Sequence, residues 1–222
     1  YFYVFRFKKF PISPSLGMRQ AIADAVSTKA DLLCVNEVPA QWISAVCELL
    51  AQAGYIYSAS SCTHSFARWN VGTIVASKDQ AQALPIHLPR ENTLQGGGGS
   101  TALYVPHINT SFIGTHLGWE VRGLSRVISR QIESLADYCL EQKNLGRKVV
   151  VAGDFNTNDL SRTPLAALDL RECARPTFPS WAPKKSLDHI LCDPSLQIMN
   201  CDTFQGSSDH LGLYADVSHP SH

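Results

Sequence analysis

The sequence predicts an α/β fold in which two packed sheets are covered by outer helices. Apolar and β-branched runs of strand length outnumber the segments with helical periodicity. The two kinds of segment are interleaved along the chain, which is typical of α/β proteins. No stretch repeats at a fixed period, so a repeat architecture is not expected.

Each element is predicted from its local pattern. Aromatic residues alternate at the N-terminus, and the other strands are apolar runs bounded by turn residues. We expect strands at residues 1–7, 31–38, 55–59, 72–77, 101–105, 111–116, 149–152, 187–192, 196–203 and 211–217. A Ser-Pro-Ser cap opens the first helix, and the second carries Trp42, Val46 and Leu49 on one face before Gly54 ends it. Helices are expected at residues 16–29, 41–53, 122–143 and 164–168.

Length and charge bound the possible functions. The chain has 222 residues and is 45% hydrophobic, which suits one domain over residues 1–222 with a substantial core. Its 19 basic and 19 acidic residues balance, which argues against a protein that depends on non-specific electrostatic attraction to nucleic acid. No apolar run reaches membrane-spanning length, and no secretory signal is recognisable. We expect a monomer without a transmembrane segment.

The cysteines bear on the redox environment. Seven are scattered singly, without a Cys-x-x-Cys pair. Cys34, Cys139 and Cys192 lie inside apolar runs, where a buried free thiol is the expected state. This pattern favours a reducing compartment, and a cytoplasmic location is the expectation.

One segment is of low complexity. Residues 95–100 read Gln-Gly-Gly-Gly-Gly-Ser, and glycine loses more conformational entropy on folding than any other residue. Residues 96–100 also match a common engineered linker unit. The segment is therefore either such a linker or a mobile loop beside a functional site.

Polar residues sit at the ends of several apolar runs. The run Val149–Ala152 is followed by Gly153, and Asp154 and Asn156 come just past its end. The same placement recurs four times more, at Glu37, His116, Asp188 and the pair Asp209-His210. Strand ends are where catalytic groups gather in α/β sheets.

Each of these residues also has an ordinary structural explanation. Glu37 suits a solvated strand end, and His116 a structural histidine. Asp154 and Asn156 suit an Asx-turn, and Asp209-His210 a turn or helix cap. Their joint occurrence favours a shared site.

Taken in order, these motifs resemble the endonuclease/exonuclease/phosphatase superfamily over residues 31–217. Gly153-Asp154-Phe155-Asn156, Leu187-Asp188 and Ser208-Asp209-His210 carry the resemblance, and residues 177–180 (Thr-Phe-Pro-Ser) are similar to its small bacterial metal-dependent hydrolases. The resemblance implies a four-layer α/β/β/α sandwich and Mg²⁺-dependent cleavage of a phosphate ester.

The chemistry of phosphoryl transfer to water suggests a role for each residue. Mg²⁺, with Mn²⁺ as the alternative, takes carboxylate oxygens, and Glu37 and Asp209 are the ligand candidates. Asp154 would activate or align water, and the Asn156 amide would hold that water or a phosphate oxygen. Three further residues complete the predicted site: His210 would donate to the phosphate, Asp188 would orient its ring, and His116 would be another donor.

Two residues are candidates for substrate contacts. Arg122 could reach outer phosphates, and Trp119 could stack on a base or sugar. A solvated helix face and packing under a loop are the respective alternatives. Nucleic acid is the first expected substrate. The alternatives are a phospholipid or inositol-phosphate headgroup, or a catalytically impaired binding module with the same fold.

In one respect the chain departs from the superfamily, which normally carries an Asn at the end of its first strand, next to the metal. No Asn precedes Asn36 here. Either residues 1–7 are a divergent first strand that brings Arg6 or Lys8 near that position, or the true first strand is missing. A cation at that position would repel Mg²⁺.

Overall fold

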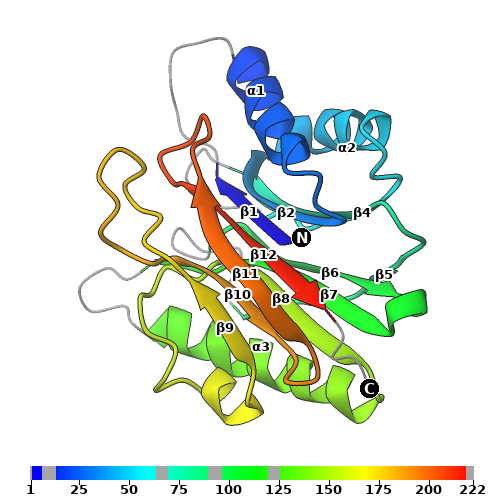
Figure 1. The fold of residues 1–222 in the computed structure, drawn as a ribbon, viewed down its shortest axis with the longest axis vertical. Coiled ribbons are helices and arrows are strands. Elements are labelled where there is room, and N and C mark those ends of the chain that lie inside the picture. Colours follow the sequence, from blue (N-terminus) through cyan, green and yellow to red (C-terminus); the bar gives the residue numbers. More distant parts are fainter. Residues whose placement is uncertain (1, 7–13, 64–69, 90–96, 120–125, 219–222) are drawn as a thin grey trace.

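The computed structural model describes residues 2–6, 14–63, 70–89, 97–119 and 126–218. Within these residues the chain forms two six-stranded sheets and three α-helices (Figure 1).

The first sheet has the strand order β11-β12-β1-β2-β4-β3. Its strands are β1 (Phe2–Arg6), β2 (Leu32–Pro39), β3 (Tyr57–Ser60), β4 (Val71–Ser77), β11 (Gln197–Phe204) and β12 (Gly212–Ser218). Strand β1 lies inside the sheet, parallel to β2 and antiparallel to β12. The N-terminal residues therefore do form a first strand, and the register pairs its last residue, Arg6, with Asn36.

The second sheet has the order β5-β6-β7-β8-β10-β9. Its strands are β5 (Gln82–Leu84), β6 (Gly99–Val105), β7 (Thr110–His116), β8 (Lys148–Asp154), β9 (Arg171–Ala174) and β10 (Asp188–Cys192). Only β7 and β8 pair in parallel among these described strands, and long helix α3 (Arg126–Asn144) connects them. Such a crossover is what parallel neighbours require.

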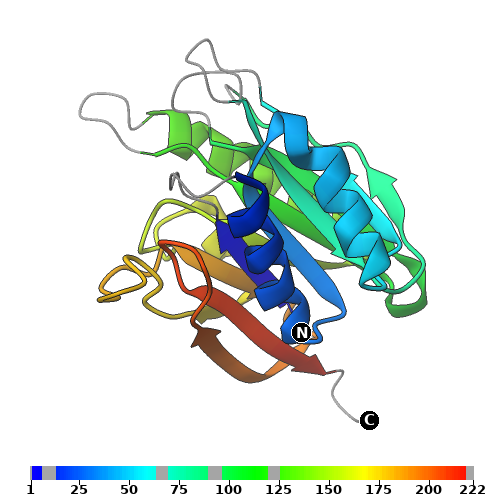
Figure 2. The same ribbon diagram turned by 90° about the horizontal axis from the view of Figure 1, so that it is seen from above.

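Helices cover the outer faces of both sheets. Helices α1 (Pro14–Ser27) and α2 (Ile43–Gln52) lie together on the first sheet, and α3 lies on the second (Figures 1 and 2). Short 3₁₀ helices occupy Ala40–Trp42, Pro106–Ile108 and Pro164–Leu168. Among the helices of the described residues, none is both long and apolar enough to cross a lipid bilayer.

Three apolar clusters separate the four layers. One fills the space between the sheets and includes Cys34, Val75 and Phe112. A second joins α3 to the second sheet, and a third joins α1 and α2 to the first. Gly114 allows the sheets to approach, because a Cβ there would lie 2.3 Å from Cγ1 of Val75. The predicted α/β/β/α sandwich is confirmed.

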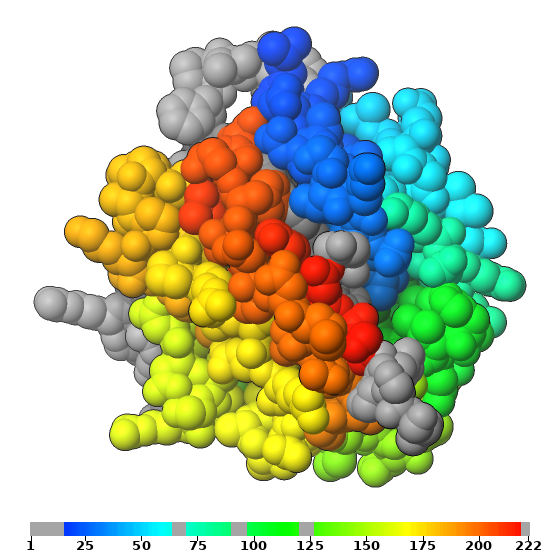
Figure 3. Space-filling view, in the orientation of Figure 1, coloured from blue at the N-terminus to red at the C-terminus, as the bar shows by residue number. Residues whose placement is uncertain are grey.

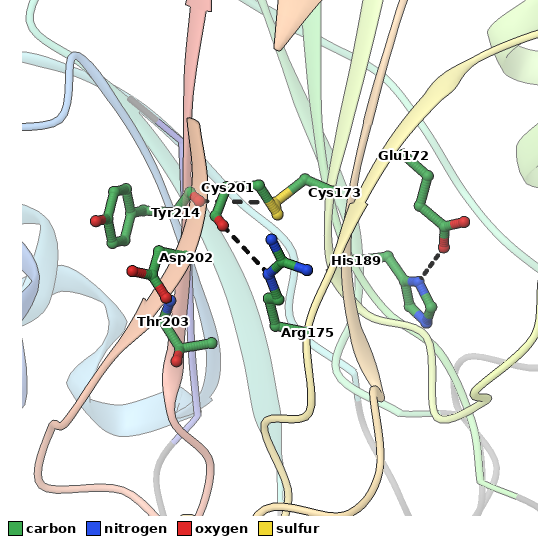
Figure 4. Close-up of a disulfide and its surroundings, with 8 residues drawn as sticks. All are labelled: Glu172, Cys173, Arg175, His189, Cys201, Asp202, Thr203 and Tyr214. Carbon is green, nitrogen blue, oxygen red and sulfur yellow. Dashed lines mark hydrogen bonds and ion pairs between the residues drawn. A yellow bond between two sulfur atoms is a disulfide. The ribbon is translucent and has the colours of Figure 1, made fainter. Parts of the chain in front are cut away.

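A disulfide joins the two sheets at one edge of the sandwich. It links Cys173 of β9 to Cys201 of β11, which are the edge strands of their sheets (Figure 4). In the space-filling view β11 and β12 lie between the blue helical region and the yellow segment that contains β9 (Figure 3). Cys34, Cys139 and Cys192 are buried free thiols, as predicted. Disulfides persist in oxidising compartments, so this bond argues against the predicted reducing compartment.

The glycine-rich segment is structured where the chain is described. Gly99 and Ser100 begin β6, and the amide of Gly98 donates to the carbonyl of His116 at 3.1 Å. The hydroxyls of Ser61, Thr63 and Thr73 donate to the carbonyls of Gly98, Gly97 and Gly99, each at 3.0 Å. Whether the segment is an engineered linker unit or a mobile loop stays a prediction, and residue 96 lies outside the described residues.

Candidate active site

Three of the predicted residues form a row across the second sheet. His116 ends β7, Asp154 ends β8 and Asp188 begins β10, and the register pairs Asp154 with both of the others. Register partners lie side by side, so one imidazole and two carboxylates meet at the same end of the sheet. All three side chains are buried.

Glu37 reaches this row from the first sheet. Strand β2 has a register irregularity between Val35 and Val38, and Glu37 there adopts a left-handed backbone with φ of 56°. Its Oε1 lies 3.7 Å from Nε2 of His116, which in turn lies 3.9 Å from Oδ2 of Asp154. Left-handed non-glycine residues are costly and cluster at functional sites. The two sheets therefore bring Glu37, His116 and Asp154 into one neighbourhood.

Asp154 and Asn156 form a tight turn at the end of β8. The amide of Asn156 donates to Oδ1 of Asp154 at 2.7 Å, and Asn156 has φ of 51°. Its side-chain Nδ2 donates to the carbonyl of Leu117 at 2.8 Å. The Asx-turn alternative is thus present in the structure, together with the convergence of the polar groups. Gly153 precedes it because a Cβ there would lie 1.8 Å from the carbonyl oxygen of Thr115.

Asp188 and His210 form a buried pair. Nδ1 of His210 lies 2.7 Å from Oδ2 of Asp188, and the hydroxyl of Thr177 donates to the same oxygen at 2.5 Å. The ring of Phe178 packs against the imidazole with centroids 4.9 Å apart. Sequence reasoning recognised the Thr-Phe-Pro-Ser segment only by its likeness to a family, and did not anticipate that Thr177 bonds to Asp188.

Asp209 is held beside this pair. It is buried, and its carbonyl accepts the amide of Ser180 at 2.7 Å. The hydroxyl of Ser180 donates to the carbonyl of Ser208 at 2.8 Å. The backbone amide and the hydroxyl of Ser180 thus fix the segment that carries Asp209 and His210.

The donor set fits a divalent cation. Asp154, Asp188 and His210 each offer one ligand atom within 4.8 Å of the others. Oδ1 of Asp188 is buried without a hydrogen-bond partner among the described residues, which is costly for a carboxylate oxygen unless a cation or donor approaches it. Hard carboxylate oxygens are the ligands that Mg²⁺ and Mn²⁺ prefer.

The thiol of Cys34, three residues before Glu37 in the sequence, is not a nucleophile. Cys34 is fully buried, and this burial raises the pKa of its thiol far above the ordinary value. The thiol donates to Oδ1 of Asn36 at 3.6 Å. Cys34 is therefore neutral at physiological pH.

The two predicted substrate contacts stay predictions. Trp119 is the third residue after β7 and is 40% exposed. Arg122 lies outside the described residues. Trp181, at 72% exposure, lies next to Ser180 and is a second tryptophan on the surface near the site.

The chain matches the Endonuclease/Exonuclease/phosphatase family over residues 12–210. It belongs to that family. The match spans the row in the second sheet, Glu37 and the Asp209-His210 pair. A search of curated proteins found no match.

Solved structures of the family share the fold at low sequence identity. An endonuclease/exonuclease/phosphatase from Beutenbergia cavernae is 18% identical, with a TM-score of 0.71 over 98% of this chain and 71% of that one. A family protein from Leptotrichia buccalis is 13% identical, with a TM-score of 0.72 over 98% of both chains. TDP2 from D. rerio, solved with a single-strand DNA product, is 13% identical, with a TM-score of 0.68 over 98% of both chains.

Proposed function

We propose that this protein is a divalent-metal-dependent phosphoesterase that hydrolyses a phosphodiester, with nucleic acid as the first substrate. One observation carries the proposal. Glu37 from one sheet faces His116 and Asp154 from the other, at the end of the sandwich where His210 pairs with Asp188. Membership of the family supports hydrolysis of phosphate esters as the reaction class.

In this proposal Glu37 and Asp209 hold Mg²⁺, with Mn²⁺ as the alternative ion. The cluster of Asp154, Asp188 and His210 is the alternative set of ligands. When bound, the ion supplies positive charge that neutralises phosphate oxygens and eases departure of the leaving group. Asp154 orients and deprotonates the attacking water, and the turn it forms with Asn156 fixes its carboxylate.

The histidines act on the phosphate. Nδ1 of His210 is engaged with Asp188, so His210 donates to a phosphate oxygen through Nε2. Asp188 stabilises the protonated ring and holds its orientation. His116, between Glu37 and Asp154, is a further donor on the same side.

Nucleic acid is favoured as the substrate because Trp119 offers an exposed ring to a base, and because a structural neighbour was solved with single-strand DNA. Arg122 would contact an outer phosphate. The alternative is a phospholipid or inositol-phosphate headgroup. A second candidate is a binding module with impaired catalysis, because β1 contains no Asn and its last residue, Arg6, pairs with Asn36 in the register. We further propose that residues 1–222 act as one domain and as a monomer.

The proposal is tested by hydrolysis of bis(p-nitrophenyl) phosphate with Mg²⁺, with Mn²⁺ and with chelator. The parent should turn over only with metal. Glu37→Gln should raise the metal concentration needed for half-maximal rate, and Asp154→Asn should lower kcat at saturating metal. His107→Gln is the matched control. His107 pairs with Asp79 and follows the C-terminal end of β6, whereas Gly99 begins that strand at its other end. Equal rates in metal and chelator would refute the mechanism. A folded, inactive parent that binds no metal by calorimetry but still binds the oligonucleotide would favour the binding module.

Substrate class is tested by titrating salt against binding. Affinity for a fluorescent single-stranded oligonucleotide should fall steeply as salt rises, because phosphate contacts release counterions. Trp119→Ala should weaken this binding. Binding to vesicles that contain phosphatidylinositol phosphate, without binding to the oligonucleotide, would favour the headgroup alternative.

A further inference from the structure

His189 lies directly beside Asp188 in sequence, but it faces the other side of the second sheet. Successive residues of a strand point to opposite faces of its sheet. Its ring packs edge-on against Phe155, with centroids 5.3 Å apart and planes at 79°, and Phe155 belongs to the cluster under α3. His189 is completely buried.

Both ring nitrogens of His189 face acceptors. Nδ1 lies 2.6 Å from Oε1 of Glu172 on β9, and Nε2 lies 2.8 Å from the carbonyl oxygen of Thr157 (Figure 4 shows the Glu172 contact). A carbonyl oxygen can only accept, and an ionised carboxylate likewise. The ring satisfies both partners at once when both nitrogens carry a proton. Burial disfavours that charge, but the bonds to Glu172 and Thr157 outweigh it and raise the pKa of His189 above its ordinary value.

Thr157 directly follows the turn that carries the candidate catalytic groups. At its start the turn is fixed by the amide of Leu117, which donates to the carbonyl of Asp154 at 2.9 Å. The amide of Phe155 donates to the carbonyl of Leu187, also at 2.9 Å. The bond from His189 fixes the end of the turn, at the carbonyl of Thr157. Thr157 follows Asn156, whose left-handed backbone is unfavourable for a non-glycine residue.

We propose that His189 is a positioning residue, whose ring is clamped between Glu172 and the Thr157 carbonyl and thereby holds the Asp154–Asn156 turn in its working geometry. The proposal rests on the phosphoesterase function above. Glu172 is part of the device, because it keeps the ring oriented toward Thr157. It is well anchored, since the next residue, Cys173, is disulfide-bonded to β11.

The test compares variants that keep or remove the bond to Thr157. His189→Leu fills the site but has no donor, and should lower kcat by about 10–100-fold while leaving KM nearly unchanged. His189→Gln places an amide nitrogen that can donate to the carbonyl, and should recover most of this loss. Glu172→Ala should lower kcat less than His189→Leu does, and it is expected to fold because the Glu172 side chain is 43% exposed. His107→Gln serves again as the control histidine.

Hydrogen exchange supplies a readout that does not need activity. Peptides covering residues 155–160 should exchange faster in His189→Leu and Glu172→Ala than in the parent, and those in β4 should not. Unchanged exchange at 155–160, or equal kcat losses in His189→Leu and His189→Gln, would overturn the positioning role. If the parent proves inactive, the phosphoesterase proposal fails, while the exchange measurement still decides whether His189 holds the turn.

Discussion

Removal of the Cys173–Cys201 disulfide should destabilise the protein substantially. The two cysteines are 28 residues apart in sequence, and the bond closes that loop between the edge strands of the two sheets. The chain-entropy relation for a loop of 28 residues corresponds to about 12 cal/mol/K, or about 3.6 kcal/mol of unfolding free energy at 25 °C. For a protein of this size, that free energy corresponds to a fall in Tm of about 7–14 °C.

The assay is thermal and urea unfolding of the parent, with and without reductant, beside the double variant Cys173→Ser/Cys201→Ser. Reductant should lower the Tm of the parent and leave that of the double variant unchanged. Cys62→Ser is the matched control, because Cys62 is a free and exposed thiol, and its Tm should equal that of the parent.

Thiol alkylation decides independently whether the bond exists. The chain has 7 cysteines, so the unfolded, unreduced protein should take up five labels, one for each free cysteine, and the reduced protein should take up all 7. Full labelling without reductant would refute the disulfide. A parent Tm that is insensitive to reductant would refute the stabilisation inferred from the loop length.

Three further predictions concern the site and its supports. Gly153→Ala should fail to fold or lose activity, because its Cβ would lie 1.8 Å from the Thr115 carbonyl oxygen. Gly17→Ala has nothing within 4 Å of its Cβ and should stabilise α1 by about 0.5–1 kcal/mol. Equal Tm values for the two variants would contradict this prediction. His210→Gln should lower kcat by about 10²–10³ at saturating metal, and Asp188→Asn should shift the pH profile of the remaining rate; a His210→Gln variant with parental kcat would exclude the donor role. Because the pKa of His189 is raised above 6.5 in the folded state, its contribution to stability should be complete below pH 6.5 and disappear as pH rises through the folded pKa. Urea unfolding of the parent and His189→Gln across pH should therefore give a stability difference that shrinks at alkaline pH, and a difference that grows would reverse the sign.

The local patterns of the sequence were sufficient for most of the secondary structure. The expected strand at 111–116 became Thr110–His116, and the expected helix at 41–53 became a 3₁₀ turn followed by Ile43–Gln52. The expected helix at 122–143 is observed as Arg126–Asn144, and its predicted first turn lies outside the described residues. Strands β5 and β9 were not predicted, since edge strands of three and four residues are too short to establish a period.

The sequence by itself determined which residue types stand at the strand ends, because a strand and the polar group after it are encoded within a few neighbouring positions. Only the tertiary structure decided that Glu37 faces His116 across the two sheets, that Cys173 meets Cys201 and that Glu172 meets His189. It also decided that Gly97–Ser100 packs beside His116. These contacts join residues far apart in the chain. They depend on strand order and register, which a local sequence pattern does not determine.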